Sequence, residues 1–148
     1  MKHLFKVVAV GLSGLLLIAC SSVAGDRVSE MNDAASALTK LSAAVDGTIR
    51  YGEPSPLLSE SDLLAMSVAD DPSLLTPLQN FILRVRREGD DSSVLVCDLH
   101  GTMALLEDAG CTPALDTHHW HASPAAPCHF TFSPRSICTQ YIMSHMPR

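Results

Sequence analysis

Residues 92–108, SSVLVCDLHGTMALLED, decide the fold of this chain of 148 residues. Two apolar runs flank DLHG, in which Asp98 stands first and Gly101 fourth. That order is typical of a type I turn closed by a left-handed glycine, a common hairpin connection. Strand alternation predicts two faces, one with Leu95, Cys97, Met103 and Leu105 and the other with Val94, Val96, Ala104 and Leu106. Both faces are apolar, so we expect a central hairpin covered on both sides.

The residues before the hairpin also alternate. A strand over NFILRVRRE (80–88) would have apolar and basic sides, with Phe81, Leu83 and Val85 against Arg84 and Arg86. Such alternation predicts a half-buried strand. The short run CHFTF (128–132) is compatible with a fourth strand, and the rest of the chain after Gly110 is expected to be irregular.

Helical periodicity governs the N-terminal part of the chain. Residues 26–46 carry apolar side chains at steps of three and four, namely Val28, Met31, Ala35, Leu38, Leu41 and Val45. Asp26 is a suitable N-cap, and Gly47 is expected to end this amphipathic helix. We favour a helix that packs on the C-terminal domain; a helix that binds a partner or a second copy is the alternative.

The segment between this helix and the sheet predicts short helices. Residues 47–59 hold two glycines and two prolines and are expected to form a loop, followed by a helix at 61–69. Asp71 with Pro72 predicts the start of a further helical turn. The predicted class is therefore α+β, with N-terminal helices packed on a small antiparallel sheet, a β-hairpin meander, in a domain at 59–148.

Residues 1–19 have the composition of a cleaved export signal. Lys2 and Lys6 precede an uncharged run from Val7 to Ala19. This run fits a secretory signal peptide and is shorter than the roughly 20 apolar residues of a membrane-spanning helix. We therefore expect this segment to direct export and then to be removed.

Leu17, Ile18, Ala19 and Cys20 resemble the lipobox of bacterial lipoproteins, although Ile18 is bulkier than the usual Ala or Ser. The resemblance implies that signal peptidase II cleaves before Cys20 and that a diacylglyceryl group is attached to its sulfur. Residues 20–25 would be a lipidated tether, and no cofactor besides this covalent lipid is expected. An ordinary secretory signal with an incidental cysteine is the alternative.

The same resemblance implies a location in the bacterial cell envelope. Ser21 and Ser22, rather than an Asp, follow Cys20, which favours the outer membrane, facing the periplasm. Of ten Lys and Arg, Lys2 and Lys6 lie in the leader, so eight remain against sixteen Asp and Glu, a formal charge of −8. Such an acidic chain is not expected to bind nucleic acid. It would reach the membrane through its lipid anchor.

Four cysteines remain in the C-terminal third: Cys97, Cys111, Cys128 and Cys138. An even number in an exported chain predicts two disulfides that stabilise this region. The spacing contains no CxxC pair, which argues against a zinc ribbon. Of the three possible pairings we expect Cys111 with Cys128, which would close the histidine-rich loop, and Cys97 with Cys138.

The densest polar cluster is DTHHWHASP (116–124). His118 and His121 are three residues apart, and neutral imidazoles at that spacing can bind zinc, copper or nickel. His129 or Asp116 could complete a site at this cluster of His118, His119 and His121. A metal-binding lipoprotein is therefore the alternative function, and a solvent-facing loop is the competing interpretation.

No motif indicates catalysis, since the serine of GLSG (11–14) lies in the predicted signal peptide. Arg84 and Arg86, with Arg87, form a basic spot on an acidic protein. A solvated strand face is one interpretation, and docking to lipopolysaccharide phosphates or peptidoglycan carboxylates is the other. We expect a non-catalytic binding or structural accessory module whose partner is an envelope protein or glycan.

Overall fold

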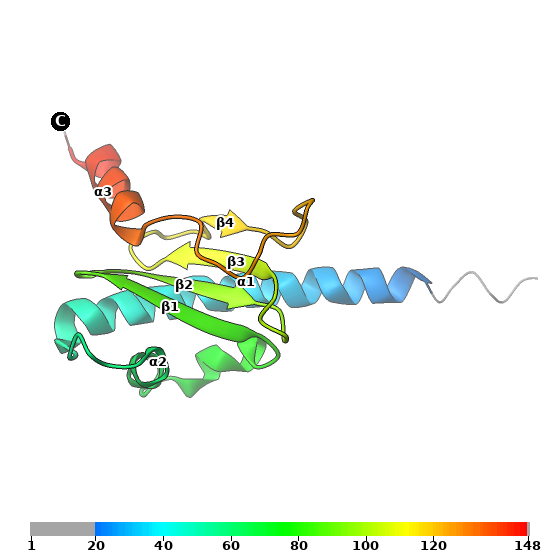
Figure 1. The fold of residues 1–148 in the computed structure, drawn as a ribbon, viewed down its shortest axis with the longest axis horizontal. Coiled ribbons are helices and arrows are strands. Elements are labelled where there is room, and N and C mark those ends of the chain that lie inside the picture. The colour runs from blue at the N-terminus through cyan, green and yellow to red at the C-terminus, as the bar shows by residue number, and fades with distance from the viewer. Residues whose placement is uncertain (1–19, 148) are drawn as a thin grey trace, which may run out of the picture.

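Helix α1 (Cys20–Gly52) runs behind a four-stranded antiparallel sheet of order β1–β2–β3–β4 (Figure 1). The computed structural model describes residues 20–147, with side chains from Gly25 onward, so the predicted signal peptide at 1–19 lies outside the described residues. The strands are β1 (Ile82–Glu88), β2 (Asp91–Cys97), β3 (Ala104–Ala109) and β4 (Thr117–His118). This arrangement confirms the predicted α+β class.

The turn between β2 and β3 is the predicted one. The N–H of Gly101 donates to the carbonyl of Asp98 at 2.9 Å, and Gly101 has a φ of 67°. The Asp98 carboxylate accepts the N–H groups of Met103 at 2.7 Å and Thr102 at 2.6 Å. These bonds, that of Met103 first, hold the pKa of Asp98 below its usual value.

The predicted side of Leu106 on β3 is confirmed, but those of Ala104 and Leu105 are wrong, because a β-bulge changes the register. Val96 pairs with Leu106 but Cys97 pairs with Ala104, so Leu105 is an extra residue on β3. Ala104 therefore packs on the side of Cys97, and Leu105, expected there, packs against the core on the other side. Alternating apolar residues on both faces of a strand give no signal for such a shift.

Helix α1 extends beyond both predicted ends of the 26–46 helix. Gly47 lies inside it, and a Cβ at Gly47 would meet nothing within 4 Å. One face is buried, comprising Met31, Ala34, Ala37, Leu38, Leu41, Ser42, Val45, Asp46 and Ile49. Burial of Ile49 and the ion pair of Arg50 with Asp46 at 2.7 Å stabilise the last turns.

The N-terminal end of α1, residues 20–30, projects from the body, and we call it the stalk (Figure 1). Every side chain from Gly25 to Glu30 is exposed, and Met31 is the first described residue that is buried. Within the described part of the chain, no helix has both the length and the apolarity needed to cross a membrane.

Two short helices complete the layer on the inner face of the sheet. Ser59 caps α2 (Glu60–Ser67) by accepting the N–H of Asp62 at 3.2 Å. Asp71 caps the 3-10 helix η1 (Pro72–Leu78) by accepting the N–H of Ser73, also at 3.2 Å, as the sequence predicts. The shared core joins α1 to the helices and sheet through Leu63, Leu78, Val85, Val94, Val96 and Leu106. Each fully buried side chain of this kind contributes about 1.5–3 kcal/mol.

Both disulfides are present, but the expected pairing is wrong: the bonds are Cys97–Cys128 and Cys111–Cys138. Because β2 and β3 are antiparallel, Cys97 lies at the turn end of the hairpin and Cys111 beyond the opposite end. After β4 the chain returns to the turn, where the N–H of Cys128 donates to the carbonyl of Thr102 at 3.1 Å. This return brings Cys128 to Cys97 and leaves Cys111 for the last helix.

The run at 128–132 is a loop and not the fourth strand that its alternation suggested. The fully buried carboxylate of Glu107 holds this loop on the outer face of the sheet by accepting the N–H of Thr131 at 3.0 Å and its hydroxyl at 2.6 Å. Helix α3 (Pro134–His145) follows, capped by Ser133, which accepts the N–H of Ser136 at 3.3 Å.

Candidate functional site

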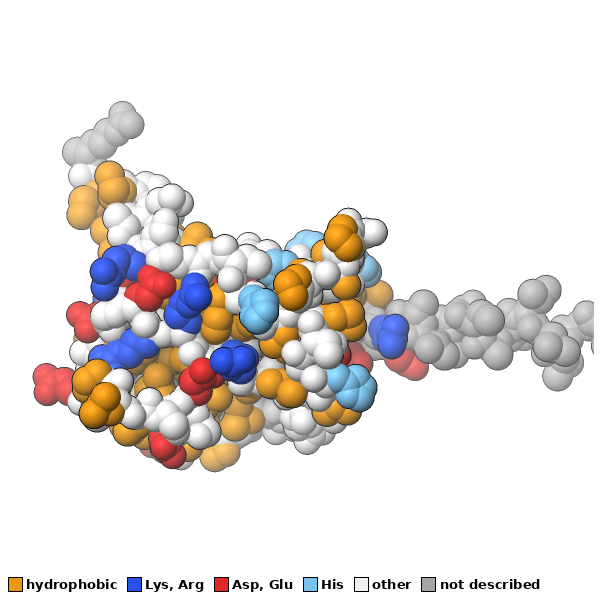
Figure 2. Space-filling model, in the orientation of Figure 1, with side chains coloured by type: hydrophobic (Ala, Val, Ile, Leu, Met, Phe, Trp, Pro, Cys, Tyr) orange, Lys and Arg blue, Asp and Glu red, His pale blue; other side chains and the backbone are white. Residues whose placement is uncertain are grey.

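Three arginines lie on the outer side of the sheet, away from α1, and a fourth lies beside them at the edge of β1. We call this surface the arginine face: Arg84, Arg86 and Arg135 on the outer side, and Arg87 at the edge. Alternation along β1 directs Arg84 and Arg86 outward, as predicted. Arg87 lies at the edge of the sheet, and Arg135 lies in the first turn of α3. Figure 2, viewed with the sheet in front, shows Lys and Arg side chains gathered on this side.

Arg84 is joined to the first residue of α2. Its Nε lies 3.0 Å from Oε2 of Glu60, and its Nη2 lies 3.3 Å from Oε1. The backbone N–H of Val85 donates to the same Oε2 at 3.0 Å. The two charged side chains remain 49% and 44% exposed, so the pair itself stabilises the fold by only about 0–1 kcal/mol.

The pKa values of both partners reflect this contact. Burial alone would raise the pKa of Glu60, but the hydrogen bonds from Arg84 and from the N–H of Val85 outweigh it and lower that pKa. The hydrogen bond to Glu60 is the main reason that the pKa of Arg84 is raised. Both groups therefore stay charged at neutral pH.

Arg86 is held by the loop before α3. Its guanidinium carbon lies 4.9 Å from the centre of the Phe130 ring, a cation–π contact worth about 0.5–1 kcal/mol at an exposed site. Its Nη1 donates to the carbonyl of Phe132 at 3.2 Å, and Glu88 is 4.0 Å away. The side chain of Arg86 is thus already positioned before any partner binds. Its shortest hydrogen bond goes to a backbone carbonyl and not to a carboxylate.

Arg87 and Arg135 converge on Gly89 in the turn between β1 and β2. Nε of Arg87 donates to the carbonyl of Gly89 at 2.8 Å, and its Nη1 donates to the carbonyl of Pro54 at 3.2 Å. A Cβ on Gly89 would lie 2.9 Å from Nη2 of Arg135, and the φ of Gly89 is 69°. Among the described residues neither arginine forms an ion pair with a carboxylate.

The helix layer has the opposite charge. A groove of about 750 Å³ lies between α1 and η1, and its charged residues are Asp26, Glu30, Asp33, Asp71 and Lys40. The molecule therefore presents a basic surface over the sheet and an acidic one along the helices.

The predicted metal site has no support in the structure. Across residues 20–147, no three His, Cys, Asp or Glu side chains come together as a metal site would require. The ring of Trp120 lies beside His118 at 6.5 Å and stacks on His121 at 4.0 Å. His119 turns inward, with Nε2 at 3.4 Å from the carboxylate of Glu107.

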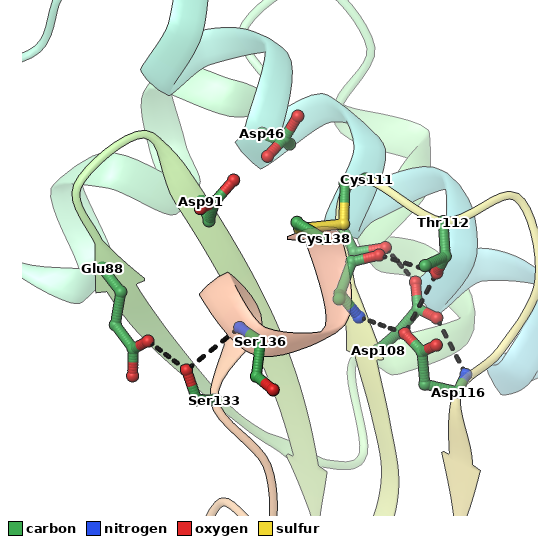
Figure 3. Close-up of a disulfide and its surroundings, with 12 residues drawn as sticks. Asp46, Glu88, Asp91, Asp108, Cys111, Thr112, Asp116, Ser133, Ser136 and Cys138 are labelled. Carbon is green, nitrogen blue, oxygen red and sulfur yellow. Dashed lines mark hydrogen bonds between the residues drawn. A yellow bond between two sulfur atoms is a disulfide. The ribbon is translucent and has the colours of Figure 1, made fainter. Parts of the chain in front are cut away.

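A second buried carboxyl group, Asp108, lies beside the Cys111–Cys138 disulfide (Figure 3). It accepts hydrogen bonds from the hydroxyl of Ser42 on α1 and from the N–H of Asp116 at 3.2 Å. Burial, followed by the nearby Asp116 carboxylate, raises its pKa from 3.8 to about 7, against the lowering effect of Ser42. Because Asp108 is fully buried, we assign it a structural role rather than a place in a binding site.

Alternation alone identified Arg84 and Arg86, but Arg135 and Glu60 were missed. Arg135 follows a proline in a segment without recognisable periodicity, and it reaches β1 through tertiary links: the α3 disulfide and the contacts of Phe132 and Ser133 with β1. The predicted lipidation residue, Cys20, begins α1, and its side chain lies outside the described part of the structure.

Searches of protein-family models, curated proteins and solved structures gave no match to this chain.

Proposed function

We propose that this protein is a lipid-anchored component of the bacterial cell envelope that binds an acidic partner through its arginine face and catalyses no reaction. One observation carries the proposal: in a chain of formal charge −8, three of the eight Lys and Arg beyond the leader lie on the outer side of the sheet, and a fourth, Arg87, lies at its adjoining edge. A random distribution of these charges would not favour one face.

The side chains on this face suit an anionic partner. A guanidinium offers two parallel donors to a carboxylate or phosphate, which a lysine cannot do. Arg86 is already oriented by Phe130 and Phe132, so less side-chain entropy is lost when it binds. The acidic helix layer repels the same partner, which selects the orientation of approach.

The anchor follows from the lipobox resemblance at residues 17–20. In the outer membrane, with the domain in the periplasm, Cys20 would attach α1 to lipid and the stalk would separate the domain from the surface. Stable attachment requires more than one acyl chain, which lipoprotein maturation supplies.

Replacing Cys20 with Ser tests the anchor. We expect the variant to lose metabolic labelling by an alkyne-tagged fatty acid and to accumulate as uncleaved precursor, because the acceptor sulfur is gone. Its matched control is Ser21→Ala, which should be labelled normally. A Cys20→Ser protein that matures into a soluble periplasmic form would contradict the proposed anchoring.

Photo-crosslinking in cells tests the face. A photoreactive residue at Ile82 or Ser136, both exposed and beside these arginines, should capture a defined envelope component. The double variant Arg86→Glu/Arg135→Glu should abolish this product.

The control is the double variant Arg27→Glu/Lys40→Glu, which changes the net charge by the same amount as Arg86→Glu/Arg135→Glu. Both of its positions lie on α1 and not on the arginine face. Crosslinking that survives reversal of the face arginines, or that falls equally in the control, would contradict the proposal.

A further inference from the structure

The free edge of β1 has backbone groups that can bind another chain. Val85 directs its N–H outward to Glu60, so every second residue of this antiparallel strand, Leu83 and Arg87 included, has outward N–H and C=O groups. In the described residues, no backbone hydrogen bond from outside the sheet reaches Leu83 or Arg87. Unpaired edges of this kind accept extended peptides.

A small pocket of about 70 Å³ adjoins this edge. Its apolar wall is formed by Pro56, Leu58 and Leu63, and Arg87 lies at its rim. The pocket is thus placed where one side chain of a peptide on β1 would point, because alternate side chains leave a strand in opposite directions.

The carboxylate of Glu60 occupies the polar end of this site. It accepts hydrogen bonds from the guanidinium of Arg84 and from the N–H of Val85. These two donors are therefore already arranged to bind a carboxylate. The pair is close to half exposed, so exchange of this carboxylate for another costs little free energy.

We propose that Glu60 is an internal substitute for the carboxylate of an acidic peptide segment, which displaces it and binds along β1. The incoming backbone pairs with Leu83, Val85 and Arg87, its carboxylate binds the guanidinium of Arg84, and an adjacent apolar side chain enters the pocket. The edge selects a peptide over a phosphate, because a phosphate gains nothing from the outward backbone groups. This inference rests on the proposed function and narrows the acidic partner to a peptide.

Removing the internal competitor should strengthen binding. In the wild type, the carboxylate of Glu60 competes with the peptide for Arg84 and Val85. The apparent affinity for the peptide therefore falls in proportion to the fraction of molecules in which Glu60 is bound there. We expect Glu60→Ala to bind an acidic peptide at least five-fold more tightly than the wild type does.

The experiment follows the backbone amide of Val85 by NMR in the isotopically labelled full chain in detergent micelles. The probes are acetyl-TVEVT-amide, the matched acetyl-TVQVT-amide and sodium acetate. In Glu60→Ala, the TVEVT peptide should give saturable shifts of the Val85 amide, and the TVQVT peptide and acetate should not at the same concentrations. Arg84→Ala added to this variant should remove the effect, and Asp70→Ala, an exposed carboxylate elsewhere, should behave as wild type.

Three results would overturn the inference: no shift of Val85 in Glu60→Ala, equal binding of TVEVT and TVQVT, or saturation by acetate alone as by a simple anion site. If Glu60→Ala does not fold, Glu60→Gln replaces it, since it keeps the hydrogen bond with Val85 and weakens the one with Arg84. It should bind the peptide with intermediate affinity, and wild-type affinity would count against the inference. Crosslinks at Ser136 that are lost in Arg86→Glu/Arg135→Glu, together with no peptide binding at β1, would contradict this inference but support the proposed function.

Discussion

Asp108 shows how one buried residue makes the molecule sensitive to pH. The groups that face it are Ser42 from α1 and Asp116 from the loop before β4. With its folded pKa at about 7 and its ordinary value at 3.8, the folded protein holds a proton that the unfolded chain releases. The contribution of Asp108 to stability is therefore full at low pH and falls as pH rises from about 4 to about 7.

We predict that Asp108→Asn removes this loss. The amide keeps an oxygen for the N–H of Asp116 and donates to the hydroxyl of Ser42, so it imitates the protonated acid. Wild type should lose roughly 2–4 kcal/mol of unfolding free energy between pH 4 and 7 from this group, and the variant should not. Urea unfolding at several pH values measures the difference.

The matched control is Asp70→Asn, which changes an exposed carboxyl group. Its pH profile should follow that of the wild type. A variant Asp108→Asn whose stability still declines over this range would show that another group is responsible.

At the scale of elements, the packing of α1 on the end of β3 depends on Gly110. A Cβ there would lie 2.4 Å from Cβ of Asp46 and 2.4 Å from the carbonyl oxygen of Ser42. The second of these atoms is backbone and cannot move aside without shifting the helix. We predict that Gly110→Ala destabilises the protein by about 1–3 kcal/mol, as overpacking does, measured by urea unfolding.

For Gly47→Ala, in the helix on which Gly110 packs, we predict the opposite change in stability. Gly47 lies in the interior of α1 with nothing within 4 Å of the new atom. Alanine should stabilise the helix by about 0.5–1 kcal/mol. If both substitutions changed the free energy of unfolding in the same direction, the close contact at Gly110 would not explain the effect of Gly110→Ala.

Gly47 also shows why the end of α1 was mispredicted. A glycine costs a helix only about 1 kcal/mol, and burial of Ile49 with the Asp46–Arg50 pair outweighs it. The hairpin was predictable because its turn requires a left-handed residue, and Gly101 adopts that conformation without steric cost. The bulge at Leu105 was not, because both faces of β3 are apolar.

Of the arginine face, the residues on β1 were predictable from the sequence, but Arg135 on α3 was not. The outward direction of Arg84 and Arg86 follows from the period of a strand. The position of Arg135 depends on which cysteine Cys138 joins, and four cysteines leave three choices that sequence cannot decide. The return of the chain to the hairpin turn, which sets this pairing, depends on tertiary contacts of Cys128 and Thr102.

For the whole molecule, the stalk and the packed part of α1 should respond differently to the same change. Ser29 and Ser36 are both exposed on α1, but only Ser36 lies in the part that packs on the sheet. We predict that Ser36→Pro destabilises the domain by about 3 kcal/mol or more. Ser29→Pro should cost less than about 1 kcal/mol, because no described side chain before Met31 is buried.

Thermal unfolding followed by circular dichroism measures both variants. Equal destabilisation would mean that the stalk contributes to the cooperative unit, and would contradict its description as a projecting spacer.

The buried stripe of α1 has a consequence for the biosynthesis of this protein. The helix is synthesised first, yet its partners Val85, Val94 and Leu106 come from strands made later. Until they arrive, the stripe from Met31 to Ile49 has nothing to pack on, so an incomplete chain exposes this apolar surface. Cys138 is the last cysteine to be synthesised, so a chain that ends before it leaves Cys111 without its disulfide partner, and this free thiol distinguishes it from a finished chain.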